Sequence, residues 1–160
     1  IAESLYGLGL VHAALGDVEA ALRSFRGSIE VARDMGDRGR TALCLIGCAY
    51  LEVEAGRHQT ARDQMVEAIK AMEELGDRWG IARCLDGFAY LHSKAGDIEK
   101  AGFLWGAATG IRQQIASPLP PSEEAMVSAR MAEARETVGF DAAYESGLSA
   151  SVEEVLKVLA

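Results

Sequence analysis

The sequence predicts an all-α superhelix built from three stacked two-helix hairpins, and three observations lead to this fold class. Residues of the same kind recur forty positions apart: Gly7, Gly47 and Gly87; Gly16, Gly56 and Gly96; Leu5, Leu45 and Leu85; Phe25, Met65 and Trp105. Between the glycines, apolar residues follow the three- and four-residue steps typical of helices, and no segment alternates as a strand does. Such periodicity indicates a repeat protein, in which each repeat buries its apolar face against a neighbour.

The glycines also predict where the helices end. We expect helices near 1–15, 18–35, 38–55, 58–75, 78–95 and 98–115. Each ends at or near a glycine, which favours a left-handed C-cap, and an Asp or Arg often follows at the start of the next helix. Connections this short make neighbouring helices antiparallel. The repeats therefore cover 1–116, divided as 1–37, 38–77 and 78–116.

The period breaks at Ser117-Pro118-Leu119-Pro120-Pro121, because prolines cannot continue a helix. Ser122 is predicted to cap a helix that runs to about 138. A short helix over 140–146 and a last helix with a capping box formed by Ser151 and Glu154 should follow. We expect this tail, 117–160, to provide capping helices of the same domain, since a solenoid must cover its last face.

Three glycines lie four residues apart on one face of the predicted sixth helix, at Gly102, Gly106 and Gly110. A glycine inside a helix costs about 0.5–1 kcal/mol relative to alanine, so this face should serve the close approach of another helix. We expect the helix over 122–138 to be that neighbour. Dimerisation through the same face is the alternative.

Composition and motifs exclude several classes of function. The formal net charge of −8 repels phosphate backbones and anionic lipids, so direct binding to nucleic acid or membranes is not expected. Three cysteines on apolar helix faces argue against a disulfide framework and favour a reducing, cytoplasmic location. Cys44 and Cys48 lie one turn apart without a second ligand pair, so no metal or other cofactor is expected.

No catalytic motif is recognisable, so the chain is not expected to be an enzyme. A glycine-rich phosphate-binding loop with a lysine, a His-Glu-x-x-His helix and a Gly-x-Ser-x-Gly turn are all missing from the sequence. By the repeat register, Ile1-Ala2 corresponds to Ile81-Ala82, which lie inside a helix. The chain is therefore expected to be a fragment of a longer protein.

Each repeat resembles the tetratricopeptide repeat. The family's pattern of large, large and small residues, followed by Gly, Ala, an aromatic and Ala, is matched three times: Leu5, Leu8, Gly9, Gly16, Ala21, Phe25 and Ser28; Leu45, Cys48, Ala49, Gly56, Ala61, Met65 and Ala68; and Leu85, Phe88, Ala89, Gly96, Ala101, Trp105 and Ala108. The chain departs from the family in its repeat length, forty residues rather than ~34, and in a Gly-Asp that replaces the closing proline.

The whole chain also resembles the carboxy-terminal repeat region of large bacterial STAND-type signal-transduction ATPases. The matching segments are 76–85, 104–108, 119–121 and 140–144. In that family a DNA-binding or nucleotide-cyclase module precedes an ATPase, and the repeats come last. The resemblance implies a sensing or interaction region of a cytoplasmic bacterial signalling or transcriptional regulator, in intramolecular contact with an upstream ATPase.

The tetratricopeptide resemblance also implies a binding groove, because in that family the first helix of each hairpin lines the concave face. The groove positions carried over to this sequence are Tyr6 in the first repeat, Leu43, Ile46 and Tyr50 in the second, and Trp79, Arg83, Asp86 and Tyr90 in the third. Aromatic area beside polar anchors is typical of recognition surfaces. We expect a protein, a peptide or a small-molecule inducer to bind there.

Two alternatives stay open at this stage. The tyrosines could pack between neighbouring repeats, and Arg83 and Asp86 could pair as surface charges along their helix. At the level of function, the repeats could serve only as an oligomerisation or autoinhibitory arm with no separate ligand, which would fit a homodimer.

Overall fold

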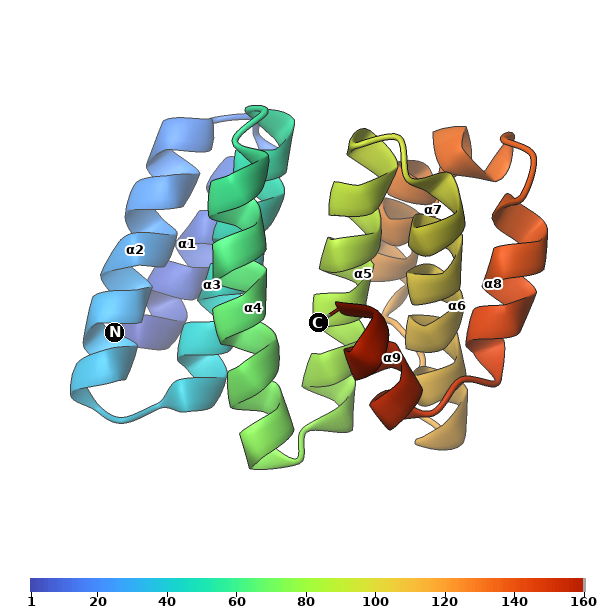
Figure 1. The fold of residues 1–160 in the computed structure, drawn as a ribbon. Helices are drawn as coiled ribbons and strands as arrows, with labels where there is room; N and C mark the ends of the chain where they lie inside the picture. Colours follow the sequence, from blue (N-terminus) through green and yellow to red (C-terminus); the bar gives the residue numbers. More distant parts are fainter. Residues whose placement is uncertain (160) are drawn as a thin grey trace. The chain divides into compact units, whose positions relative to one another are not determined.

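The computed structural model describes residues 1–159, and all regular structure within them is helical (Figure 1). The helices are α1 (Ala2–Ala14), α2 (Val18–Asp34), α3 (Arg38–Glu54), α4 (His58–Leu75), α5 (Arg78–Lys94), α6 (Ile98–Gln114), α7 (Pro121–Arg135), α8 (Phe140–Leu148) and α9 (Val152–Leu159). The first six match the predicted ranges to within one residue at each end. The predicted all-α, tetratricopeptide-like fold with a helical tail is confirmed.

The described residues form two compact units, 1–80 (unit 1) and 81–159 (unit 2). Unit 1 holds the first two hairpins, α1–α2 and α3–α4. Unit 2 holds almost all of α5, together with α6 and the tail helices α7 to α9. The predicted limits of the three repeats and of the tail stay predictions about sequence register.

Glycine and aspartate at the helix junctions explain where the helices stop and start. The glycines at these junctions have positive φ angles between 66° and 83°: Gly16, Gly36, Gly56, Gly76 and Gly96. Glycine adopts this conformation without the steric cost of a Cβ atom, so the predicted left-handed caps are confirmed. At four of these five junctions the next residue is an aspartate that accepts a hydrogen bond from the backbone N–H three residues on, as Asp37 does from Arg40 at 2.8 Å and Asp77 from Gly80 at 2.9 Å. Arg57, which follows Gly56, makes no such bond.

The core of unit 1 is organised around Phe25 of α2, whose side chain is almost completely buried between α1 and α3. A Cβ atom added at Gly9 of α1 would lie 2.5 Å from this ring, and one at Gly47 of α3 would lie 2.8 Å from it. Both helices therefore need glycine where the ring lies. One turn further along α2, Ser28 donates a hydrogen bond to the carbonyl of Ala2 at 2.7 Å.

In unit 2 the glycine face of α6 packs against α8, so the prediction that the helix over 122–138 fills it was wrong (Figure 1). A Cβ atom at Gly102 would lie 2.8 Å from the carbonyl oxygen of Phe140. A Cβ atom at Gly106 or Gly110 would overlap the backbone of α8 at Tyr144 or Leu148. These partners also lie four residues apart and rise in the same order, so α6 and α8 run parallel with their backbones in close contact.

The start of α7 also differs from the prediction. Ser122 was expected to cap this helix, but the N-cap is Pro120 and the helix begins at Pro121. Proline suits the first position of a helix because its missing N–H has no partner there in any case. The capping box before α9 is confirmed: the N–H of Ser151 donates to Glu154 Oε2 at 2.7 Å, and the N–H of Glu154 donates to Ser151 Oγ at 3.2 Å.

Candidate binding surface

In unit 1 an aromatic and charged surface lies where the first helices α1 and α3 meet. The Tyr6 side chain is half-buried, with its ring centroid 5.9 Å from that of Phe25. The guanidinium carbon of Arg40 lies 5.1 Å from the centre of the Tyr6 ring, within reach of a cation–π interaction. Arg40 also lies 3.9 Å from the carboxylate of Glu3, whose side chain is 86% exposed. An aromatic ring, a cation and a carboxylate therefore share this surface.

The other predicted groove residues of unit 1 differ in their exposure. Leu43 and Tyr50 of α3 are half-buried, and so is Trp79 at the start of α5. Ile46 is only 2% exposed and belongs to the core. Arg40 was missed by the sequence reasoning, although it lies three residues before Leu43 and therefore on the same face of the helix. We call Tyr6, Arg40, Leu43, Tyr50 and Trp79 the first-helix surface.

In unit 2 the tail helix α7 contacts the predicted groove residues of α5. Nη1 of Arg83 lies 2.6 Å from the carboxylate of Glu123. The Tyr90 ring lies 5.6 Å from the guanidinium carbon of Arg130 and is 4% exposed. Lys94 approaches Glu133 at 3.8 Å. Because each of them contacts a side chain of α7, Arg83 and Tyr90 are packed residues within this unit.

Asp86 forms a buried ion pair with Arg112 of α6. The two residues are 4% and 6% exposed, so the interpretation of Asp86 as a surface charge was wrong. Burial raises the pKa of the Asp86 carboxyl, and the Arg112 guanidinium is the largest influence in the opposite direction. Nε of Arg112 is buried as well and has no hydrogen-bond partner among the described residues.

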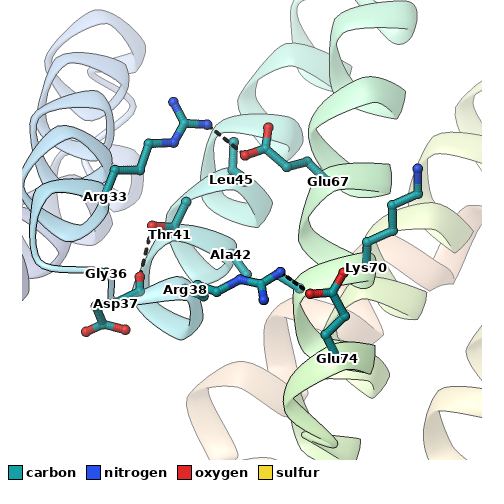
Figure 2. Close-up of a pocket in the computed structure, with 11 residues that line it drawn as sticks. Arg33, Gly36, Asp37, Arg38, Thr41, Ala42, Leu45, Glu67, Lys70 and Glu74 are labelled. Atoms are coloured by element: carbon teal, nitrogen blue, oxygen red, sulfur yellow. Dashed lines mark hydrogen bonds and ion pairs between the residues drawn. The ribbon is translucent and has the colours of Figure 1, made fainter.

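An open pocket of about 410 Å³ lies in unit 1 between α2, α3 and α4 (Figure 2). Arg33 and Glu67 pair across it at 2.7 Å, and Arg38 pairs with Glu74. Cationic and acidic side chains balance here: Arg33, Arg38 and Lys70 against Asp37, Glu67 and Glu74. The pocket therefore has no strong preference for the charge of a ligand. The sequence reasoning missed it because the family resemblance selects positions on first helices only.

A larger pocket, of about 660 Å³, lies in unit 2 between α6, the segment after it, α7 and α8. Its polar side chains include Arg112 and Arg135, and the hydroxyl of Tyr144 donates to Thr109 Oγ1 at 2.9 Å. Its apolar side chains include Leu119, Val127 and Met131. Glu124 is the one acidic residue that lines it within the described chain, and because Arg112 is already paired with Asp86, Arg135 is the lining cation without an acidic partner there.

The three cysteines are buried within the helices. Burial raises the pKa of the Cys48 thiol to about 12 and raises that of Cys44. Within 1–159 there is no group of three His, Cys, Asp or Glu residues placed to hold a metal ion. Over the same residues, no helix is both long enough and apolar enough to cross a lipid bilayer.

The fold, a series of antiparallel helical hairpins, is that of a helical-repeat protein. The family model of the tetratricopeptide repeat matches residues 1–74, which span α1 to α3 and nearly all of α4. This match supports a tetratricopeptide repeat domain. Repeats of this kind generally mediate protein–protein interactions and are typically non-catalytic. A search of curated proteins found no match to the chain.

Proposed function

We propose that the chain is a protein-interaction module that binds a peptide segment on the first-helix surface of unit 1. The observation that carries this proposal is the position of the Arg40 guanidinium above the half-buried Tyr6 ring. Arg40 lies on α3, the helix that also carries Leu43 and Tyr50. Tyrosine, tryptophan and arginine are the residues on which binding energy most often concentrates. In unit 2 the corresponding face of α5 is packed against α7, which restricts the proposed site to unit 1.

The charges favour a ligand that brings a carboxylate to this surface. Arg40 has Glu3 as an ionic neighbour, but the two groups are 3.9 Å apart and the Glu3 side chain is 86% exposed. An exposed pair of this kind contributes about 0–1 kcal/mol. A ligand carboxylate can therefore replace Glu3 on the Arg40 guanidinium at little cost, while apolar ligand groups pack on Leu43 and the tyrosine rings. The preferred ligand is a peptide with an acidic residue beside apolar ones.

The wider context that we propose is a cytoplasmic bacterial signalling or transcriptional regulator with an ATPase upstream of the repeats. The resemblance of segments 76–85, 104–108, 119–121 and 140–144 to the STAND-type family supports this context. A bound ligand would then shift an equilibrium between two arrangements of the repeats on the ATPase, in proportion to its different affinities for them.

Selection of peptides from a random display library, followed by calorimetry, tests the binding proposal. We expect selected peptides to lose at least about tenfold in affinity with Arg40→Ala or Tyr50→Ala, which corresponds to about 1.4 kcal/mol. Arg23→Ala is the matched control, because Arg23 is an exposed arginine on α2 away from this surface. Equal affinity for all three variants, with folding intact by circular dichroism, would reject the site.

A second candidate function is the sensing of an anionic small molecule in the larger pocket of unit 2. Arg135 lines this pocket without an acidic partner among the described residues, and beside Val127 and Met131 it favours an amphipathic carboxylate there. In a thermal-shift screen, such a ligand should raise the melting temperature of the wild-type chain and of Tyr50→Ala. It should not raise that of Arg135→Gln. A shift that is the same in all three proteins would rule out this pocket.

A further inference from the structure

One face of α1 is apolar and exposed. Leu8 is 49% exposed, Val11 54% and Leu15 76%, and these residues lie three and four positions apart along the helix. They therefore form one continuous stripe on a single face of the helix. We call Ser4, Gly7, Leu8, Val11 and Leu15 the outer face of α1.

The repeat register identifies what this face corresponds to in the next hairpin. Forty residues on, Ser4, Gly7 and Leu8 become Cys44, Gly47 and Cys48 of α3. On α3 this face packs against α2, the second helix of the preceding hairpin: the thiol of Cys44 donates to Ser28 Oγ at 3.2 Å, and Gly47 lies against the Phe25 ring. Cys48 is 1% exposed, whereas its counterpart Leu8 is about half exposed.

Gly7 shows the difference most directly. A Cβ atom at Gly47 would lie 2.8 Å from the Phe25 ring, so glycine is needed there. A Cβ atom at Gly7 would have no atom of another element within 4 Å in the described part of the chain. A glycine costs stability inside a helix, and at Gly7 no neighbour within 1–159 requires one. The space above Gly7 fits a large apolar side chain in the position of Phe25.

The chain itself does not offer a second helix for this face. The face of α2 is used by α3, as described above. In α4 the residue equivalent to Phe25 is Met65, which is 0% exposed, and in α6 it is Trp105, which is 1% exposed with its ring 6.0 Å from Phe140 of α8. Because these side chains are already buried within each copy, a second copy of the chain cannot stack on α1 in the manner of α2 on α3.

We propose that the outer face of α1 is the docking site for the second helix of a further tetratricopeptide hairpin. That helix packs on α1 as α2 packs on α3, and it places a Phe, Met or Trp side chain on Gly7. The Ser4 hydroxyl and the apolar side chains of Leu8, Val11 and Leu15 complete the contact. This site is separate from the first-helix surface, because it is formed by residues that share a helix face with Gly7, and neither Tyr6 nor Arg40 belongs to it.

A fusion protein tests the proposal directly. A copy of residues 17–40, which comprises α2 and the junction after it, is placed immediately before Ile1. Arg40 of the copy then precedes Ile1 as Arg40 precedes Thr41 in the natural register. We expect the melting temperature to rise by roughly 5–10 °C relative to the unfused chain. Amide exchange in α1 should slow by at least about tenfold, since docking suppresses local opening.

The matched control is the same fusion with Phe25→Ala in the copy only, which should lose most of the gain. Val11→Lys reads the docked state from the other side: it should leave the unfused chain almost unchanged, because Val11 is exposed there, and remove the gain of the fusion. The proposal is wrong if the fusion gains no stability or gains as much with Phe25→Ala. It is also wrong if the unfused chain dimerises in light scattering and Val11→Lys abolishes the dimer, because the occupant is then a second copy.

Discussion

The side chains of Asp86 of α5 and Arg112 of α6 form an ion pair with each other, and they are only 5% and 7% exposed. The pair joins two helices across 26 positions of sequence, and Arg83 and Arg130 add further positive charge near the same carboxylate. Removing two charges from water costs several kcal/mol per ion, so neither charge is stable in the core without its partner. This contact makes the packing of α5 on α6 depend on two specific side chains.

Removing one partner of this pair should therefore destabilise the protein strongly. We expect Arg112→Met alone to lower the free energy of unfolding by about 3–5 kcal/mol, because it leaves an unpaired carboxylate in the core. The double variant Asp86→Leu with Arg112→Met should lose much less, since no buried charge remains. Urea unfolding followed by circular dichroism measures both values. A double variant that loses as much free energy of unfolding as Arg112→Met alone, or more, would contradict this account of the pair.

Gly106 and Gly7 are both helical glycines, but alanine should act on them in opposite directions. At Gly106 a Cβ atom would overlap the backbone of Tyr144, so Gly106→Ala should push α8 away and cost about 1–3 kcal/mol. At Gly7 the space is open in the described chain, so Gly7→Ala should stabilise α1 by about 0.5–1 kcal/mol. Thermal unfolding of the two variants gives the comparison, and equal effects at the two sites would refute it.

The buried thiol of Cys48 predicts a loss of stability at alkaline pH. Its pKa is about 12 in the folded chain, against an ordinary value of 9.0. Below pH 9 both states keep the proton, so this group contributes no pH dependence there. Between pH 9 and 12 the unfolded chain releases the proton first, and stability falls by about 1.4 kcal/mol per pH unit. Urea unfolding from pH 8 to 10.5 should show this slope in the wild type and a shallower one in Cys48→Ala.

The capping box before α9 makes an opposite prediction at acid pH. Backbone and side-chain hydrogen bonds with Ser151 lower the pKa of the Glu154 carboxyl from its ordinary value of 4.5. The stabilisation of α9 is therefore present above that value, and it is lost as the pH falls through the lower folded pKa. An NMR titration should show Glu154 with a pKa below its ordinary value of 4.5 in the wild type, and a higher pKa for the same residue in Ser151→Ala.

How far the sequence predicted the structure depended on whether a feature is local or long-range. The ends of the first six helices were predicted to within a residue because each depends on a few neighbouring positions, such as Gly36 and Asp37, whereas α7 ends at Arg135 and not near 138 as predicted. The helix that packs on the face of Gly106 was not predicted correctly. Periodicity shows that this face allows close approach, but it does not show which helix packs there. Burial of Asp86 was missed for the same reason: its partner is 26 residues away, and spacing along one helix favoured Arg83.

The candidate site was predicted in outline only. The resemblance selected Tyr6, Leu43 and Tyr50, which the structure places on α1 and α3, but it could not show that α7 packs against Tyr90. It also passed over Arg40, because the family pattern describes which positions line a groove and not which charges a given chain supplies. Whether the first-helix surface binds a ligand stays a prediction that the affinity measurements above decide.

The backbone contact between α6 and α8 limits where the protein can be lengthened by engineering. A duplicated forty-residue module could be inserted between Gly36 and Asp37, with the same Gly-Asp junction at both of its ends. Each helix–helix interface that it forms would then copy one that the chain already has. A module inserted after Gln114 would pack on α6 only if it displaced α8. The face of Gly102, Gly106 and Gly110, which carries no side chains, would then leave unfilled volume against the new helix. Elongation should therefore succeed at the early junctions and fail at the last one.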